Sequence, residues 1–288
     1  MNRTGLLIAL ALAAAVGLLF GFFPRLDLDL ERPFFDPAAG GFWFSFHPVS
    51  NALRDLSRWL VTLLVAPAVL AILVKLVLPR RPMLIPGRAA VLMVVTLALA
   101  PGLVTNVLLK SHWGRPRPID VVEFGGDQHF VPWWDPRGDC PDNCSFVAGE
   151  PSGAFWTLAP AALVPPAWRA LATAAALAFG AGIGLVRLAG GGHFFTDVVF
   201  SGIFTFLVIW LTHGLMFRWR ATRISDRTVE RALERLVLPL QGAVARHLPG
   251  RWARRGATPP SQPVEQPDAQ AGRPAKAAEA ANAAGEGG

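Results

Sequence analysis

The chain has 288 residues, of which 52% are hydrophobic and only 16% are charged, and its mean hydropathy is +0.40. Soluble domains carry about 25% charged residues, so this composition argues against an ordinary soluble enzyme. The formal net charge is +7, and its meaning depends on which side of a membrane the basic residues occupy.

Six apolar runs follow one another along the chain. A hydrocarbon layer about 30 Å thick needs roughly 20 apolar residues in a helix. The first run has no clean small-residue cleavage site, so we interpret it as a retained anchor and not as a signal peptide. The fourth run is short and contains three prolines. The sequence predicts an all-α integral membrane six-helix bundle over residues 1–223, with runs at 5–23, 60–78, 89–109, 154–166, 170–188 and 195–217.

The basic residues of the short connecting segments predict the orientation of these helices. If the N-terminus is cytoplasmic, the arginines that flank the runs fall on the cytoplasmic side, as the positive-inside rule requires. Two long segments, 24–58 and 110–151, then lie on the other side. We expect a multi-pass protein of a bacterial-type inner membrane with both termini in the cytoplasm. Orientation explains the net charge, so no nucleic acid partner is expected; the arginines are Arg3, Arg80, Arg81, Arg88, Arg169, Arg218, Arg220 and Arg223.

The region after the sixth run has two parts. Residues 224–248 repeat apolar side chains at helical spacing with arginines and glutamates opposite them, which predicts an amphipathic cytoplasmic helix. Such a helix either lies on the membrane surface or packs on the bundle ends or on another chain. Residues 249–288 contain almost no large apolar residue, so we expect a disordered tail.

Three polar stretches, at 110–118, 149–153 and 187–193, fall on the extracytoplasmic side in this arrangement. They contain three cations, Lys110, Arg117 and Arg187. Cations together with glycines and a helix N-terminus form an anion site that suits phosphate.

A histidine and an aspartate lie next to this predicted anion site. His193 and Asp197 are four residues apart at the start of the sixth run, so their side chains share one helix face. The carboxylate can accept from one imidazole nitrogen and direct the other, as for a histidine nucleophile or base.

The order and spacing of these residues resemble the three-part motif of the type 2 phosphatidic acid phosphatase superfamily. The resemblance covers about 89–217. It implies that Lys110, Arg117 and Arg187 bind phosphate, that His193 attacks phosphorus and that Asp197 orients His193. It also implies catalysis with no metal and no cofactor.

The second motif departs from that family, whose Pro-Ser-Gly-His element supplies a histidine as general acid. Read literally, the element here is 151–153 and Ala154 follows it. In the register that we favour, 145–150 aligns with the element and Glu150 takes the histidine position. A carboxyl group with a raised pKa can act as a general acid. The alternative is that Glu150 only favours the helix N-terminus, and that the general acid is lost or is supplied by another group such as His112 or His129. Around this element, Gly149, Ser152 and Gly153 are expected to bind substrate.

The two cysteines, Cys140 and Cys144, lie in the extracytoplasmic segment between the first and second motifs. An oxidising compartment favours a local disulfide between them over free thiols. Two thiols at this spacing are too few for a metal site.

The predicted activity is therefore a metal-independent phosphatase that forms a phosphohistidine and acts on a lipid in the bilayer. The expected substrate is a membrane phospholipid, a polyprenyl phosphate or pyrophosphate, or a lipid A phosphate. The alternatives are a lipid phosphotransferase and a non-catalytic lipid-phosphate binder or transporter. The related vanadium haloperoxidases are soluble, which six membrane spans argue against. The sequence leaves the lipid and the oligomeric state open.

Overall fold

The computed structural model describes residues 2–247, so the expected tail at 249–288 lies outside the described residues. Within the described residues, five helical segments are long and apolar enough to cross a membrane. They are α1 (Arg3–Phe22), α3 (Pro48–Val77), α4 (Gly87–Leu97) continued by η2 (Ala98–Leu109), α7 (Pro166–Ala189), and α8 (Phe195–His213) continued by η5 (Gly214–Arg218). The all-α membrane prediction is confirmed, with five long segments and not six.

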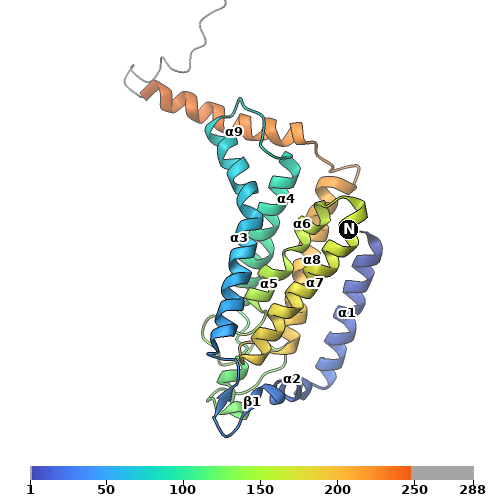
Figure 1. Cartoon of the computed structure of the whole chain (residues 1–288), viewed down its shortest axis with the longest axis vertical. Coiled ribbons are helices and arrows are strands. Elements are labelled where there is room, and N and C mark those ends of the chain that lie inside the picture. Colours follow the sequence, from blue (N-terminus) through green and yellow to red (C-terminus); the bar gives the residue numbers. More distant parts are fainter. Residues whose placement is uncertain (1, 248–288) are drawn as a thin grey trace, which may run out of the picture. The chain divides into compact units, whose positions relative to one another are not determined.

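The fourth predicted span is a broken helix made of α5 (Gly149–Phe155) and α6 (Leu158–Leu163). Pro160 lacks the N–H that would donate to the carbonyl of Trp156 four residues earlier. The N–H of Ala159 bonds to that carbonyl instead, at 2.8 Å, and the helix is interrupted there. The two pieces run alongside α7 between the same two ends of the bundle (Figure 1).

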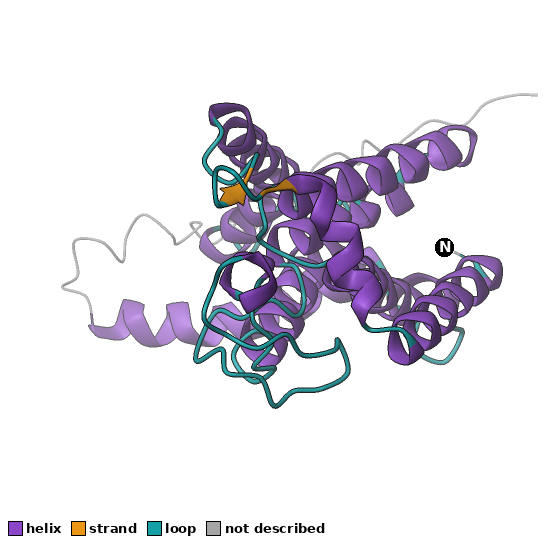
Figure 2. Ribbon diagram, turned by 90° about the horizontal axis from the view of Figure 1, so that it is seen from below, coloured by secondary structure: helices purple, strands orange, loops and turns teal. Residues whose placement is uncertain are grey.

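The segments outside the spans gather at the two ends of the bundle (Figure 1). One end, called here the motif end, carries α2 (Arg25–Glu31), η1 (Arg32–Phe34), the hairpin of β1 (Phe35–Asp36) and β2 (Gly41–Phe42), η3 (Pro118–Asp120) and η4 (Val122–Phe124). Figure 2 looks onto this end and shows loops and both strands in front of the helices. The N-terminus and α9 (Asp226–His247) lie at the opposite end.

Helix α3 begins at Pro48, which is 12 residues before the predicted run at 60–78. Its 30 residues correspond to a length of about 45 Å, which exceeds the roughly 30 Å of a hydrocarbon layer. The additional turns project at the motif end. They carry Arg54 toward the start of α5, where it contacts Glu150.

Helix α9 packs on the end of the bundle. Glu234 reaches the buried ammonium of Lys75 at 2.6 Å, and Asp226 pairs with Arg88 at 3.1 Å. Leu236 and Leu240, by contrast, are 62% and 61% exposed. These residues of α9 therefore pack on the bundle through ion pairs, and part of the apolar surface of the helix remains uncovered.

An aromatic cluster supports the loop that leads into α5. The rings of Trp133 and Phe200 stack with centroids 4.4 Å apart, and both pack against Phe146. Phe146 is 1% exposed and directly follows Ser145. Burial of these rings fixes the backbone of Ser145, which the motif residues contact.

Candidate active site

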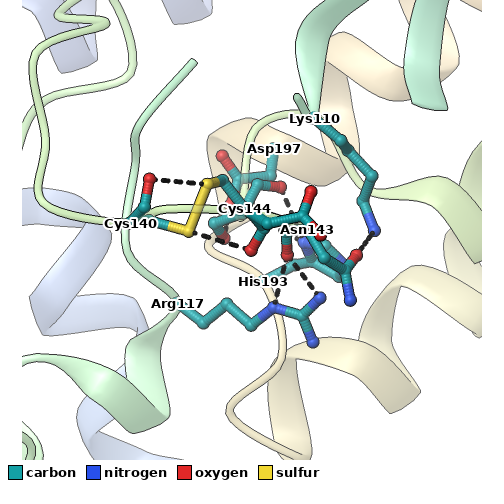
Figure 3. Close-up of a disulfide and its surroundings, with 9 residues drawn as sticks. Lys110, Arg117, Cys140, Asn143, Cys144, His193 and Asp197 are labelled. Atoms are coloured by element: carbon teal, nitrogen blue, oxygen red, sulfur yellow. Dashed lines mark hydrogen bonds and ion pairs between the residues drawn. A yellow bond between two sulfur atoms is a disulfide. The ribbon is translucent and has the colours of Figure 1, made fainter. Parts of the chain in front are cut away.

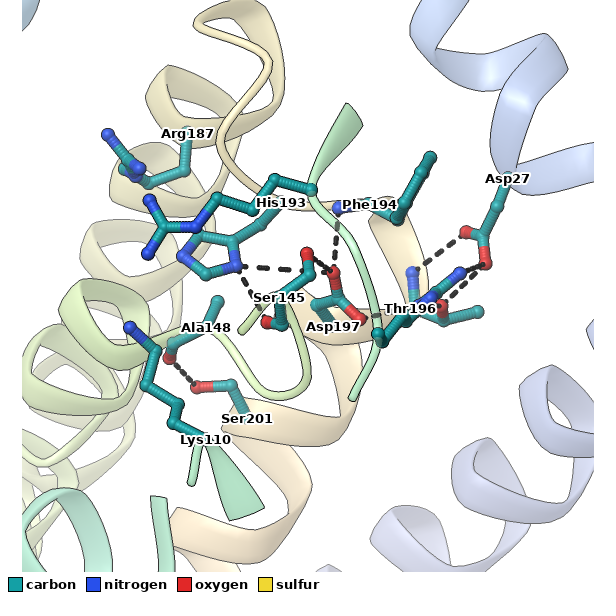
Figure 4. A network of polar contacts seen from close by, with 12 residues as sticks. Asp27, Lys110, Ser145, Ala148, Arg187, His193, Phe194, Thr196, Asp197 and Ser201 are labelled. Carbon is teal, nitrogen blue, oxygen red and sulfur yellow. Dashed lines mark hydrogen bonds and ion pairs between the residues drawn. The ribbon is translucent and has the colours of Figure 1, made fainter. Parts of the chain in front are cut away.

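The three predicted phosphate-binding cations come together at the motif end. Lys110 directly follows η2, Arg117 lies in the next loop, and Arg187 is in the last turn of α7. Figure 4 shows the side chains of Lys110 and Arg187 on the same side of the ring of His193. Burial and the charges of Arg117 and Arg187 lower the pKa of Lys110 to about 8. The part of this shift that comes from the two arginines reflects positive charge that a bound anion would relieve.

The glycines between α7 and α8 allow the loop before His193 to pass close to Arg187. Gly191 has a φ of +65°, in the left-handed region that favours glycine. A Cβ atom at Gly192 would lie 2.1 Å from Nη2 of Arg187. The absence of side chains therefore lets the backbone approach the guanidinium closely.

His193 is 2% exposed, and its Nδ1 donates to the backbone oxygen of Ser145 at 2.8 Å. A carbonyl oxygen can only accept, so the neutral ring carries its proton on Nδ1 and a lone pair on Nε2. Burial and the three neighbouring cations hold the pKa of His193 well below its usual value. The imidazole is therefore neutral near pH 7, the form that a nucleophile requires.

Asp197 does not bond directly to His193, in contrast to the expectation from their spacing. Its Oδ2 lies 4.0 Å from Nδ1 of His193, beyond hydrogen-bond range. That oxygen accepts from the hydroxyl of Ser145 at 2.5 Å and from the N–H of Phe194 at 2.9 Å. Asp197 caps the start of α8 and reaches His193 through Ser145, because the carbonyl of Ser145 occupies the position next to Nδ1.

Glu150 forms an ion pair with two arginines. Its carboxylate accepts from Nε of Arg54 at 2.9 and 3.0 Å, and Oε2 lies 3.2 Å from Nε of Arg187. These arginines lower the pKa of Glu150 despite its partial burial. The expectation of a raised pKa and a general-acid role is therefore not supported, because the carboxylate is ionised near pH 7 and anchors Arg187.

The other residues expected around the second motif have different surroundings. A Cβ atom at Gly149 would lie 3.6 Å from Nζ of Lys110, so this glycine borders the cationic region. Ser152 is fully buried and bonds to the hydroxyls of Thr105 and Thr205 at 3.1 and 2.9 Å. Its position on α5 faces η2 and α8, so it joins helices and is not free to bind phosphate. A Cβ atom at Gly153 would meet no atom within 4 Å, and this glycine has no contact that links it to the site.

The predicted disulfide between Cys140 and Cys144 is present and closes a short loop over the cations. Asn143 of this loop accepts from Lys110 through its side-chain oxygen at 2.8 Å and from Nη2 of Arg117 through its backbone oxygen at 2.7 Å (Figure 3). The loop thereby holds both first-motif cations in place.

Three functional neighbours were not predicted from the sequence. Arg54 approaches because α3 is longer than its apolar run. Arg115 is fully buried and pairs with Asp197 and with Asp27 of α2. No spacing links Asp27 to Arg115, which are 88 residues apart. The alternative acids from the sequence, His112 and His129, are exposed.

Among residues 2–247 there is no group of three or more histidine, cysteine, aspartate or glutamate side chains arranged to hold a metal ion. The cations of the site are side chains of the chain itself. The donor set is thus suited to an anion, with a neutral imidazole beside it.

Comparison with known proteins agrees with this geometry. The model of the PAP2 superfamily matches residues 89–221. A lipid A 4'-phosphatase of Francisella tularensis subsp. novicida (strain U112) is 35% identical over 220 residues, covering 76% of this chain and 98% of that protein. The chain belongs to the PAP2 superfamily. It is a multi-pass membrane protein and a membrane lipid phosphatase of this superfamily.

Two further relatives match over a shorter part of the chain. A lipid A 4'-phosphatase of Rhizobium leguminosarum is 40% identical over 113 residues, covering 39% of this chain and 48% of that protein. A lipid A 4'-phosphatase of Rhizobium etli is 38% identical over 112 residues, covering 39% of this chain and 44% of that protein. No solved structure gave a significant match.

Proposed function

We propose that this PAP2 phosphatase removes a phosphate monoester from lipid A, at the 4'-position, through a phosphohistidine at His193. The names of three relatives supply the substrate class. The observation that carries the mechanism is the hydrogen bond from Nδ1 of His193 to the carbonyl of Ser145, which leaves the Nε2 lone pair for phosphorus. The three cations beside the ring support phosphate as the group that is attacked.

The reaction has two steps. Nε2 of His193 attacks phosphorus, the bond to the sugar oxygen breaks, and the leaving alkoxide takes a proton from water. Water then attacks the phosphohistidine, which releases inorganic phosphate and restores the neutral imidazole. Lys110, Arg117 and Arg187 neutralise the phosphoryl oxygens in both steps.

Asp197 acts in this proposal through Ser145 and not by direct contact with the imidazole. As Nε2 bonds to phosphorus the ring becomes cationic, and a carboxylate 4.0 Å from Nδ1 stabilises that charge. The ion pair with Glu150 keeps Arg187 directed at the phosphate.

The site faces the periplasm of an inner membrane in this proposal, and both termini are cytoplasmic. Helix α3 ends at Val77, α4 begins at Gly87 and η5 ends at Arg218, at the ends of these segments opposite the motif end. The arginines at 80, 81, 88, 218, 220 and 223 lie in or next to these ends, and positive residues favour the cytoplasmic side. The disulfide of the motif end also suits an oxidising compartment.

The experiment is phosphate release by the purified protein from lipid A carrying the 1-phosphate, the 4'-phosphate or both. Phosphatidic acid, phosphatidylglycerol phosphate and an undecaprenyl pyrophosphate serve as comparison lipids. We expect free phosphate from the 4'-position, and none after His193→Ala. Release from another lipid alone would overturn the substrate assignment, a phosphorylated second lipid would identify a transferase, and binding without turnover would identify a binder.

A further inference from the structure

Arg115 lies at the centre of a fully buried polar network beside the site. Its side chain is 0% exposed, and its two acidic partners, Asp27 and Asp197, are 1% and 0% exposed. Nη1 of Arg115 donates to Asp197 at 2.5 Å, and Nη2 donates to Asp27 at 2.8 Å. One guanidinium therefore joins α2 to the start of α8.

Arg115 also contacts the other support of His193. Its backbone oxygen accepts from the N–H of Ser145 at 2.8 Å, and its guanidinium lies 4.4 Å from the ring centre of Phe194. Ser145 in turn presents its carbonyl to Nδ1 of His193 and its hydroxyl to Asp197. The two residues next to Nδ1 of His193, Ser145 and Asp197, are thus both bonded to Arg115.

Asp27 completes the link from α2. Its carboxylate accepts from the N–H and the hydroxyl of Thr196 at 3.1 and 2.6 Å, and Nη1 of Arg115 donates to the same hydroxyl at 2.8 Å. Asp27 therefore holds both Arg115 and the first turn of α8, three residues after His193.

The charge balance of the network explains why a buried arginine is needed. The carboxylates of Asp27 and Asp197 are both buried. A third acid, Glu31, is 0% exposed, and within the described residues its carboxyl oxygens have no hydrogen-bond partner. Burial and these two aspartates raise the pKa of Glu31 to about 10, so Glu31 is neutral. Arg115 places a positive charge against both aspartates, and its loss would leave two buried carboxylates that repel one another.

We propose that Arg115 and Asp27 are positioning residues for the phosphatase reaction, which hold Asp197 and Ser145 so that Nε2 of His193 points at phosphorus. This inference rests on the proposed role of His193 as nucleophile. It gives α2, a short segment between two spans, a part in catalysis. Neither residue touches the phosphate, so binding of the anion does not depend on them.

The test is a double-mutant cycle on the full chain in detergent micelles, with Arg115→Gln, Asp197→Asn and the double variant. We expect Arg115→Gln to lower kcat about 100-fold in the otherwise wild-type protein. In the Asp197→Asn background the same substitution should lower kcat less than about 3-fold further, because the free-energy effects of residues that act as a unit do not add. The loss should be equal for a lipid phosphate and for p-nitrophenyl phosphate, because misplacement of the nucleophile affects both. The inhibition constant of inorganic phosphate should change less than about 3-fold.

A second variant and a matched control keep the test independent of folding. Asp27→Asn preserves size and is expected to lower kcat about 10-fold, again with little further effect in the Asp197→Asn background. Lys75→Met removes an equally buried cation at the opposite end and should lower the melting temperature without changing kcat of the folded fraction.

Three results would overturn the positioning role. The first is a double variant whose loss in kcat equals the product of the two single losses. The others are a change confined to KM and a wild-type kcat in Asp27→Asn. His193→Ala separates this failure from failure of the mechanism. If His193→Ala abolishes turnover while the cycle is multiplicative, only the positioning role is wrong. If His193→Ala stays active, the proposed nucleophile itself is wrong.

Discussion

His193 donates from Nδ1 to the backbone oxygen of Ser145 at 2.8 Å. A carbonyl oxygen can only accept, so this bond fixes the tautomer of the neutral ring, with the proton on Nδ1. Ser145 belongs to the favoured register of the second motif, which therefore contributes a backbone group to orient the nucleophile.

Glu150→Gln tests whether the second motif supplies the general acid. A general acid typically raises the rate about 10²–10⁴-fold when the leaving group is poor. The alcohol of a lipid monoester is a poor leaving group and p-nitrophenolate is a good one, so loss of the acid should slow the lipid reaction far more. Because Glu150 instead anchors Arg187, we expect similar losses in kcat/KM on both substrates. The exposed Glu123→Gln is the control and should match wild type. A loss restricted to the lipid monoester would restore the general-acid role.

The literal register of the second motif makes a separate prediction. Ala154 is fully buried on α5, so a histidine there would meet packed side chains and not the phosphate. We expect Ala154→His to give no rate increase on lipid monoesters, as measured by phosphate release. A gain in rate would support the register in which Ala154 takes the acid position.

The pH dependence of substrate capture should report Lys110. Its pKa of about 8 means that the ammonium is charged below pH 8 and loses its proton as the pH rises through that value. kcat/KM for the lipid phosphate should therefore fall above about pH 8. In Lys110→Arg the positive charge persists, so this limb should move to higher pH. An identical limb in both proteins would assign it to another group.

Reduction of the disulfide should weaken substrate binding. The loop closed by Cys140 and Cys144 holds Asn143 against Lys110 and Arg117. Loosening it removes preorganisation of both cations, so KM should rise several-fold while kcat changes little. The double variant Cys140→Ser/Cys144→Ser should show the raised KM without reductant and no further response to it. Unchanged kinetics after complete reduction would exclude this role for the loop.

The sequence was sufficient for the features that depend on local pattern. Apolar runs predicted the spans, and fixed spacings predicted Lys110, Arg117, Arg187 and His193 as neighbours. Sequence pattern did not predict the features that depend on how the helices pack. Pro160 splits the fourth run, and Ser152 lies in the right motif but turns toward Thr105 and Thr205.

Contacts between distant segments were beyond the reach of spacing rules. Asp27 and Arg115 meet only because α2 folds back under α8. Glu150 lies beside Arg187, but its protonation depends on Arg54, which is 96 residues away along the chain. The apolar run of α3 gave no sign that Arg54 belongs to the same helix.

The central claim, covalent catalysis by His193, is tested most directly by trapping the intermediate. The protein is mixed with lipid A labelled in its 4'-phosphate and quenched in alkali, under which phosphohistidine survives, and its peptides are examined by mass spectrometry. The account predicts one phosphate on His193, which disappears during a chase with unlabelled lipid and is absent from His193→Ala. Turnover with no phosphate on His193, or with phosphate on another residue, would contradict it.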